Sequence, residues 1–183
     1  MIGYILLGLA VLAVLWAIAI YNGLVRRRNI VAEAWSGIEA QLKRRADLIP
    51  NLVETVKGYA AHERTTLDEL TRLRSASQAG QEIAQRAETE RAITAAIGRI
   101  MAVAEAYPQL RASENFQSLQ KDLAEIEDQI QLSRRYYNGA VRDYNVMIEQ
   151  VPSNLIASTF AFTKASFFQI ENAVDRDVPK VAF

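Results

Sequence analysis

The chain has 183 residues, 50% of them hydrophobic, and its 21 basic side chains balance 21 acidic ones. This balance disfavours a dedicated nucleic-acid binder, because such proteins usually carry a clear basic excess. The absence of cysteine excludes disulfides, thiolate metal sites and cysteine nucleophiles, and one histidine is too few for the usual zinc sites. We therefore expect no cofactor and no metal.

The first elements of the chain predict a membrane anchor over residues 1–25. No side chain from residue 2 to residue 25 is charged, and the run is nearly all aliphatic. As a helix, about 20 residues cover the ~30 Å hydrocarbon core of a bilayer. Trp16 and Tyr21 lie where aromatic rings favour the membrane interface. A cleaved signal peptide is the competing interpretation, but its positive charge would precede the apolar run.

A basic cluster, Arg26, Arg27 and Arg28, follows the apolar run directly. Basic residues close to a membrane-spanning end resist translocation. The cluster therefore predicts a single-pass protein with a short N-terminus outside and a cytoplasmic body. The opposite orientation is the alternative.

Beyond the cluster, apolar residues recur at spacings of three and four, which is typical of one helical face. The longest such stripe runs from Phe116 to Val151. Breaks are expected at residues 75–81, at Pro108, after which Ser113 would cap the next helix, and at Pro152. Because each amphipathic helix must hide its stripe, we expect an all-α fold: an N-terminal transmembrane helix, then an antiparallel four-helix bundle of long helices over residues 26–151. A coiled coil with other copies is the alternative, and self-association of a bundle stays open.

The stretch 44–63 gathers charged groups around Pro50. Proline lacks an amide donor and disfavours helical geometry at the preceding residue. The simplest interpretation is a helix that ends near Arg45 and another that begins about Asp47, with Pro50 in its first turn. Arg44 and Arg45 would then lie at a helix C-terminus, and Asp47 would act as a cap. A single kinked helix is the alternative.

His62, followed by Glu63, is the one histidine. A membrane-bound hydrolase or metal-dependent enzyme using this pair is a hypothesis. The pair lacks the second histidine of a zinc-protease helix, because Thr66 stands at that position. A polar residue at a bundle face is the favoured interpretation, so no catalytic residue is expected.

Three long segments carry a family resemblance: "YNGLVRRRNIVAEAWSGIEAQLKRRADLIPNLVETVKGYAAHE", "AEAYPQLRASENFQSLQKDLAEIEDQI" and "RRYYNGAVRDYNVMIEQVPSNLIA". In order and detail they closely resemble the LemA family of bacterial membrane proteins. The resemblance implies a single N-terminal anchor, a cytoplasmic antiparallel four-helix bundle and no established reaction. The motif positions to which it assigns a structural role are Trp35, Arg44, Arg45, Asp47, Pro50, Asn51, His62, Pro108, Asn115, Phe116, Tyr137, Asn138, Tyr144, Asn145 and Pro152.

The segment 152–183 is rich in aromatic residues: Phe160, Phe162, Phe167 and Phe168. It is either a flap that packs on the bundle or a candidate interface with a partner copy or the membrane.

Taken together, the sequence favours a non-enzymatic, membrane-anchored scaffold. Its expected partners are the lipid bilayer and other copies of the chain. The resemblance also implies an alternative, an adaptor for a membrane metalloprotease, because such enzymes are often encoded near family members, and one relative is associated with shaping a membrane compartment.

Overall fold

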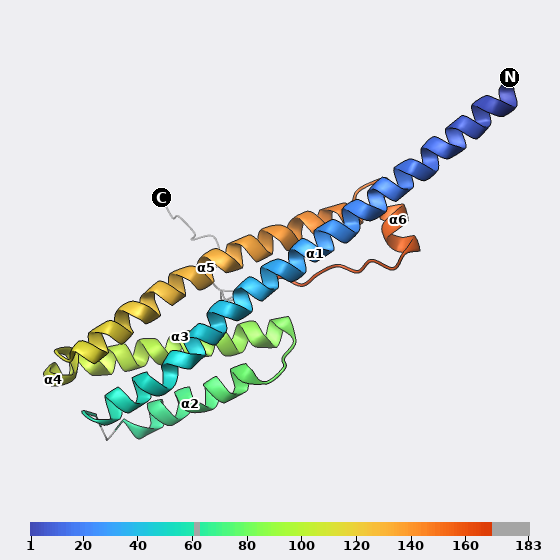
Figure 1. Cartoon of the computed structure of the whole chain (residues 1–183). Coiled ribbons are helices and arrows are strands. Elements are labelled where there is room, and N and C mark those ends of the chain that lie inside the picture. Colours follow the sequence, from blue (N-terminus) through green and yellow to red (C-terminus); the bar gives the residue numbers. More distant parts are fainter. Residues whose placement is uncertain (61–62, 170–183) are drawn as a thin grey trace, which may run out of the picture. The chain divides into compact units, whose positions relative to one another are not determined.

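The computed structural model describes residues 1–60 and 63–169. Within these ranges every regular element is a helix and none is a strand, which confirms the all-helical fold class (Figure 1). The helices in chain order are α1 (Ile2–Lys57), α2 (Arg64–Gln78), α3 (Ile83–Glu105), α4 (Pro108–Arg111), α5 (Glu114–Glu149) and α6 (Ser153–Thr159).

Helix α1 continues through Pro50, so the expected break between Arg45 and Asp47 is wrong. Proline at position 50 cannot donate to the carbonyl of Ala46, the acceptor four residues earlier. The side chain of Arg74 on α2 replaces the missing donor, because its Nε lies 2.8 Å from the Ala46 oxygen. A tertiary contact thus satisfies the acceptor that the proline leaves open, and Asp47 is a mid-helix residue rather than a cap.

The later breaks follow local turn chemistry. Helix α2 ends before Gly80, and α3 ends before Pro108, which occupies the first turn of α4. Proline is tolerated there because the first amides of a helix have no intrahelical acceptor. Ser113 immediately precedes α5, as expected.

Contacts within the chain divide it into two units, each described by itself. Unit 1 combines Met1–Ile38 with Ser133–Phe167, and unit 2 combines Glu39–Leu132 with the described residues from Phe168 on. Helices α1 and α5 each contribute to both units. The predicted domain boundaries at residues 25 and 151 stay predictions.

The core of unit 2 takes one apolar face from each of its four longer helical segments. In α2 and α3, which pack against each other, the buried positions repeat at spacings of three and four, as an amphipathic helix requires (Figure 1). The buried cluster comprises Ile49, Leu52, Val53, Val56, Ala60, Leu67, Leu70, Leu73, Ile93, Ala96, Ile100, Ala104, Leu110, Phe116 and Leu123.

Unit 1 has a smaller core. Leu24 of α1, Tyr144 of α5 and Ala157 of α6 are buried together. Partly buried neighbours, including Ile20 and Phe162, surround them. These apolar contacts place α6 and the chain after it against the part of α1 around Leu24, just before the basic cluster.

Candidate membrane interface

The N-terminal part of α1 is apolar and is not covered by the rest of the described chain. Side chains 1–16 are all exposed, and Leu12 and Trp16 expose 63% and 52% of their surface. By length and composition α1 is the one described helix that is long and apolar enough to cross a membrane. An exposed apolar surface of this extent on a folded chain marks an interface with a membrane or a partner.

The predicted arginine flank lies where the apolar segment ends. Arg26, Arg27 and Arg28 are all exposed. Arg27 lies 3.8 Å from the Asp143 carboxylate of α5, in a pair that is half exposed on both sides. The guanidinium of Arg28 instead lies over the ring of Phe162, 5.3 Å from its centroid. Such a stack leaves the positive charge of Arg28 available to solvent or headgroups.

The described chain after α6, residues 160–169, is called the tail, and two of its aromatic residues pack on the end of the apolar segment of α1. The rings of Phe160 and Phe162 meet Tyr21 edge-on, with centroids 4.8 Å and 5.6 Å away. Between them Ala161 adopts a positive φ of 53°, a conformation that is unfavourable for a residue with a side chain. That turn lets both neighbouring rings reach the same tyrosine.

Helix α5 holds the tail in place through two polar side chains. The Asn145 amide donates to the Ala165 carbonyl at 3.0 Å, and its oxygen accepts from the Ala165 amide at 2.9 Å. The Tyr137 hydroxyl donates to the Ser166 carbonyl at 2.8 Å. Burial raises the pKa of Tyr137, because the phenolate loses solvation more than the phenol does.

Tyr144, buried in the unit 1 core, responds to the same arginine flank. Burial raises the pKa of Tyr144, and the positive charge of Arg28 opposes that shift. Arg28 therefore acts electrostatically on the interior of unit 1 although its own side chain is exposed.

The four phenylalanines among the described residues of the tail differ in environment. Phe160 and Phe167 expose 57% and 40% of their surface, whereas Phe162 is half-buried and Phe168 is fully buried. The aromatic cluster is therefore not one continuous exposed patch.

The family-motif positions also divide by burial. Trp35 and Tyr137 form an aromatic pair within unit 1, with centroids 5.4 Å apart. His62 lies outside the described residues. Of the other positions, Arg45, Phe116, Tyr137 and Tyr144 are buried, Trp35, Asn138, Asn145 and Pro152 are half-buried, and Arg44, Asp47, Pro50, Asn51, Pro108 and Asn115 are exposed.

Arg45 is not at a helix end but is buried within unit 2, with 2% of its side chain exposed. Its Nη2 donates to Glu90 Oε2 on α3 and its Nη1 to Glu127 Oε2 on α5, both at 2.7 Å. Nη1 also donates to the Thr94 hydroxyl at 2.7 Å. The assignment of Arg45 to a helix C-terminus is wrong because α1 continues for three further turns.

Glu90 is also buried, with 1% of its side chain exposed, and it extends the network to α2. Its Oε1 accepts from the Ser77 hydroxyl at 2.6 Å and from Arg86 Nε at 2.8 Å. One ionic network thus contains residues of α1, α2, α3 and α5.

Sequence reasoning missed Glu90 and Glu127 as partners of Arg45. The sequence does, however, indicate that Arg45 is buried. Arg45 follows Leu42 by three residues and precedes Ile49 by four, so a charge interrupts an apolar stripe. Such an interruption indicates a buried charge that needs a partner.

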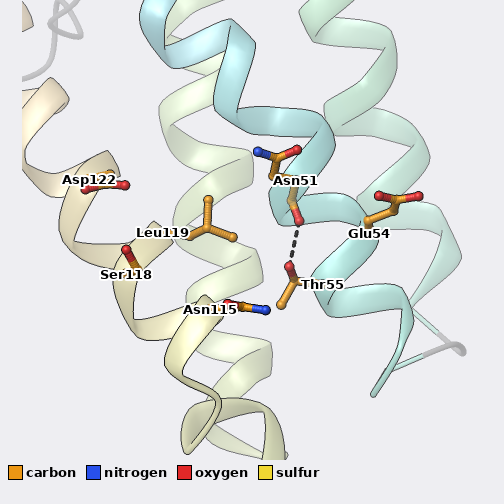
Figure 2. Close-up of a pocket in the computed structure, with 7 residues that line it drawn as sticks. All are labelled: Asn51, Glu54, Thr55, Asn115, Ser118, Leu119 and Asp122. Atoms are coloured by element: carbon orange, nitrogen blue, oxygen red, sulfur yellow. Dashed lines mark hydrogen bonds between the residues drawn. The ribbon is translucent and has the colours of Figure 1, made fainter.

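An open polar groove lies between α1 and α5 in unit 2 (Figure 2). Its volume is about 350 Å³, and the Thr55 hydroxyl at its rim donates to the Asn51 carbonyl at 2.7 Å. Two carboxylates, Glu54 and Asp122, line it with Asn115, Ser118 and Leu119. No group of three or more His, Cys, Asp or Glu side chains suited to a metal ion occurs among residues 1–60 and 63–169.

The fold and the candidate interface define a class of protein: a helical chain whose first helix combines a membrane-length apolar segment, a basic flank and a core-forming segment. Residues 34–183 match the model of the LemA family, and the chain belongs to that family.

Similarity to curated relatives covers different shares of the chain. Magnetosome proteins MamQ 2 and MamQ 1 of Paramagnetospirillum magneticum are each 36% identical over 83 residues, which is 45% of this chain and 30% of each relative. Protein LemA of Metamycoplasma hominis is 27% identical over 158 residues, which is 86% of this chain and 72% of that protein. The chain thus spans less than a third of the length of the magnetosome proteins that it matches, and the names of these relatives state no reaction.

Proposed function

We propose that this chain is a non-enzymatic scaffold, anchored in the inner membrane of a bacterium, that self-associates and organises partners or membrane at the cytoplasmic face. One observation carries the proposal: α1 contains both the exposed apolar segment and side chains of the unit 2 core. A single helix of this kind holds a packed helical body at a bilayer.

The proposed body is an antiparallel four-helix bundle. Its support is the shared core of α1, α2, α3 and α5 in unit 2, together with the ionic network of Arg45 that includes a residue from each of them. Short connections between successive helices favour antiparallel neighbours.

Self-association has support from apolar side chains exposed outside the anchor. Leu132 and Tyr136 on α5 expose 50% and 59% of their surface and lie one helical turn apart. Neighbouring exposed apolar residues favour a contact between proteins.

Sedimentation of the full chain in mild detergent tests this proposal. We expect a protein mass of at least two chains of 20.5 kDa each. The double substitution Leu132→Glu and Tyr136→Glu should lower the mass, whereas Gln129→Glu, a change at an exposed polar position of the same helix, should not. A monomer at every concentration for the unsubstituted chain would contradict self-association.

The proposed orientation can be tested separately by cysteine labelling, because the chain has no native cysteine that would react. Ser75 is exposed on α2 and Ile2 is exposed at the start of α1. A membrane-impermeant maleimide should label Ile2→Cys in spheroplasts and should label Ser75→Cys only after lysis. The reverse pattern would place the body outside.

A further inference from the structure

Four residues of the apolar segment form one face of α1 beside the tail. Val14, Ala17, Ile18 and Tyr21 are spaced as successive turns of a helix, and with Phe160 they line an apolar cavity of about 260 Å³. Phe160 is more than half exposed, and its ring meets Tyr21 edge-on. A tail residue thus completes a groove on the membrane-facing surface of α1.

The groove lies at a definite depth if α1 spans the bilayer. Tyr21 follows Ile2 by about 29 Å of helix, close to the ~30 Å thickness of the hydrocarbon core. Val14 then lies about 10 Å deeper than Tyr21. At that depth no water is available to fill an apolar groove, and the surrounding molecules are acyl chains.

Positive charge lies above the groove on the same face. Arg28 follows Tyr21 by seven residues, which is two helical turns or about 10 Å towards the headgroups. Its guanidinium is exposed and stacks on Phe162, and among the described residues no ion pair joins it to a carboxylate. Arg26 and Arg27 beside it are exposed as well.

Contacts within the chain alone position the tail beside this groove. Asn145 holds the Ala165 backbone by two hydrogen bonds, and the positive φ of Ala161 directs Phe160 and Phe162 to the same ring of Tyr21. A conformation of this kind in a residue with a side chain persists only where the surroundings impose it.

We propose that this groove holds one acyl chain of an anionic phospholipid whose phosphate contacts Arg28. The apolar lining fits the chain, the depth matches the upper part of a leaflet, and the unpaired arginine complements the phosphate. The inference rests on the proposed membrane anchoring and adds to it a bound lipid and a preference for negative headgroups.

Native mass spectrometry of the full chain in mild detergent tests the inference, with phosphatidylglycerol and phosphatidylcholine as probes. We expect one phosphatidylglycerol to stay bound at concentrations where phosphatidylcholine does not. Phe160→Ala should lower its occupancy about fivefold or more, because the groove loses one wall. Arg28→Gln should abolish the preference for phosphatidylglycerol.

Two further variants keep the result interpretable. Ala17→Phe fills the groove without removing a core contact and should also prevent binding. Phe167→Ala removes an exposed aromatic residue that does not line the groove, and it should leave binding unchanged. Circular dichroism establishes that each variant keeps its helices.

Several outcomes would overturn the inference. Equal lipid occupancy in Phe160→Ala, Ala17→Phe and the unsubstituted chain would show that the groove holds no lipid. Equal retention of the two lipids would refute the contact with Arg28. A lipid-free dimer that Phe160→Ala dissociates would identify a second copy as the occupant. If carbonate washing extracts the chain from membranes, the proposed anchoring fails, whereas an integral protein without bound lipid refutes the groove alone.

Discussion

Replacing Arg45 by methionine perturbs the most deeply buried charges in unit 2. The substitution keeps an unbranched side chain but removes both charge-assisted contacts, to Glu90 and Glu127 at 2.7 Å. Glu90 keeps Arg86 and Ser77 but loses the partner of its Oε2 while 1% exposed. Removing one partner of a buried pair typically costs 3–5 kcal/mol, so we expect a loss of about 3–5 kcal/mol in the free energy of unfolding.

The exposed pair of Arg99 and Glu69 provides a matched control. Its N–O distance is also 2.7 Å, but its side chains are 50% and 41% exposed. Pairs in high dielectric contribute about 0–1 kcal/mol, so Arg99→Met should cost less than about 1 kcal/mol. The two substitutions make the same chemical change at the same contact distance, but they differ in burial and in the number of partners that the arginine loses.

A double substitution removes the buried carboxylate oxygen that Arg45→Met leaves without a donor. In Arg45→Met with Glu90→Met, no buried carboxylate lacks its partner, and Glu127 is 31% exposed and accessible to water. We expect the double variant to be more stable than Arg45→Met alone. Urea unfolding of the full chain in mild detergent, followed by circular dichroism, measures all four proteins. If Arg45→Met and Arg99→Met cost the same within about 1 kcal/mol, the reasoning from burial is refuted.

Three further predictions concern individual hydrogen bonds. Arg74→Met should lower the free energy of unfolding by about 1–3 kcal/mol, because the Ala46 carbonyl loses its donor. In a Pro50→Ala background this loss should be smaller, because residue 50 regains an amide. Equal losses in both backgrounds, measured by urea unfolding, would contradict this account. Asn145→Leu should accelerate hydrogen exchange in residues 160–168 but not in α2, and unchanged exchange in the tail would show that the asparagine does not hold it. Because burial raises the pKa of Tyr137 above its value of 10.0 in the unfolded chain, the folded chain retains this proton as the pH rises. The contribution of this group to stability is therefore complete below pH 10.0 and declines above it. The decline in melting temperature should be smaller in Tyr137→Phe, and coincident pH profiles of the two proteins would refute the assignment.

Local sequence patterns were sufficient to predict most helices, but not the continuity of α1 through Pro50. The spacing of apolar residues and the positions of Pro108 and Ser113 predicted α3 and α5 closely, because their ends follow local turn chemistry. The continuity of α1 depends on Arg74, which lies 28 residues from Ala46 in sequence. No local rule contains that donor, so a proline signal was interpreted as a break.

Local sequence patterns also could not identify contacts between residues that are distant in sequence. The partners of Arg45 lie 45 and 82 residues away, and only the interrupted apolar stripe indicated that they exist. In the tail, composition identified an aromatic cluster, but it could not distinguish exposed Phe160 from buried Phe168. That distinction depends on tertiary contacts that single residues do not encode.

Energy transfer between labelled copies in vesicles tests the central claim most directly, because it detects self-association of the anchored chain in a bilayer. Ser75→Cys is an exposed and unique labelling position, so donor and acceptor populations can be prepared separately and reconstituted together. We predict that transfer persists as the vesicles are diluted with further lipid and falls when unlabelled chain is added. Transfer that decreases with dilution to the level of a labelled anchor peptide of residues 1–28 would contradict a self-associating scaffold.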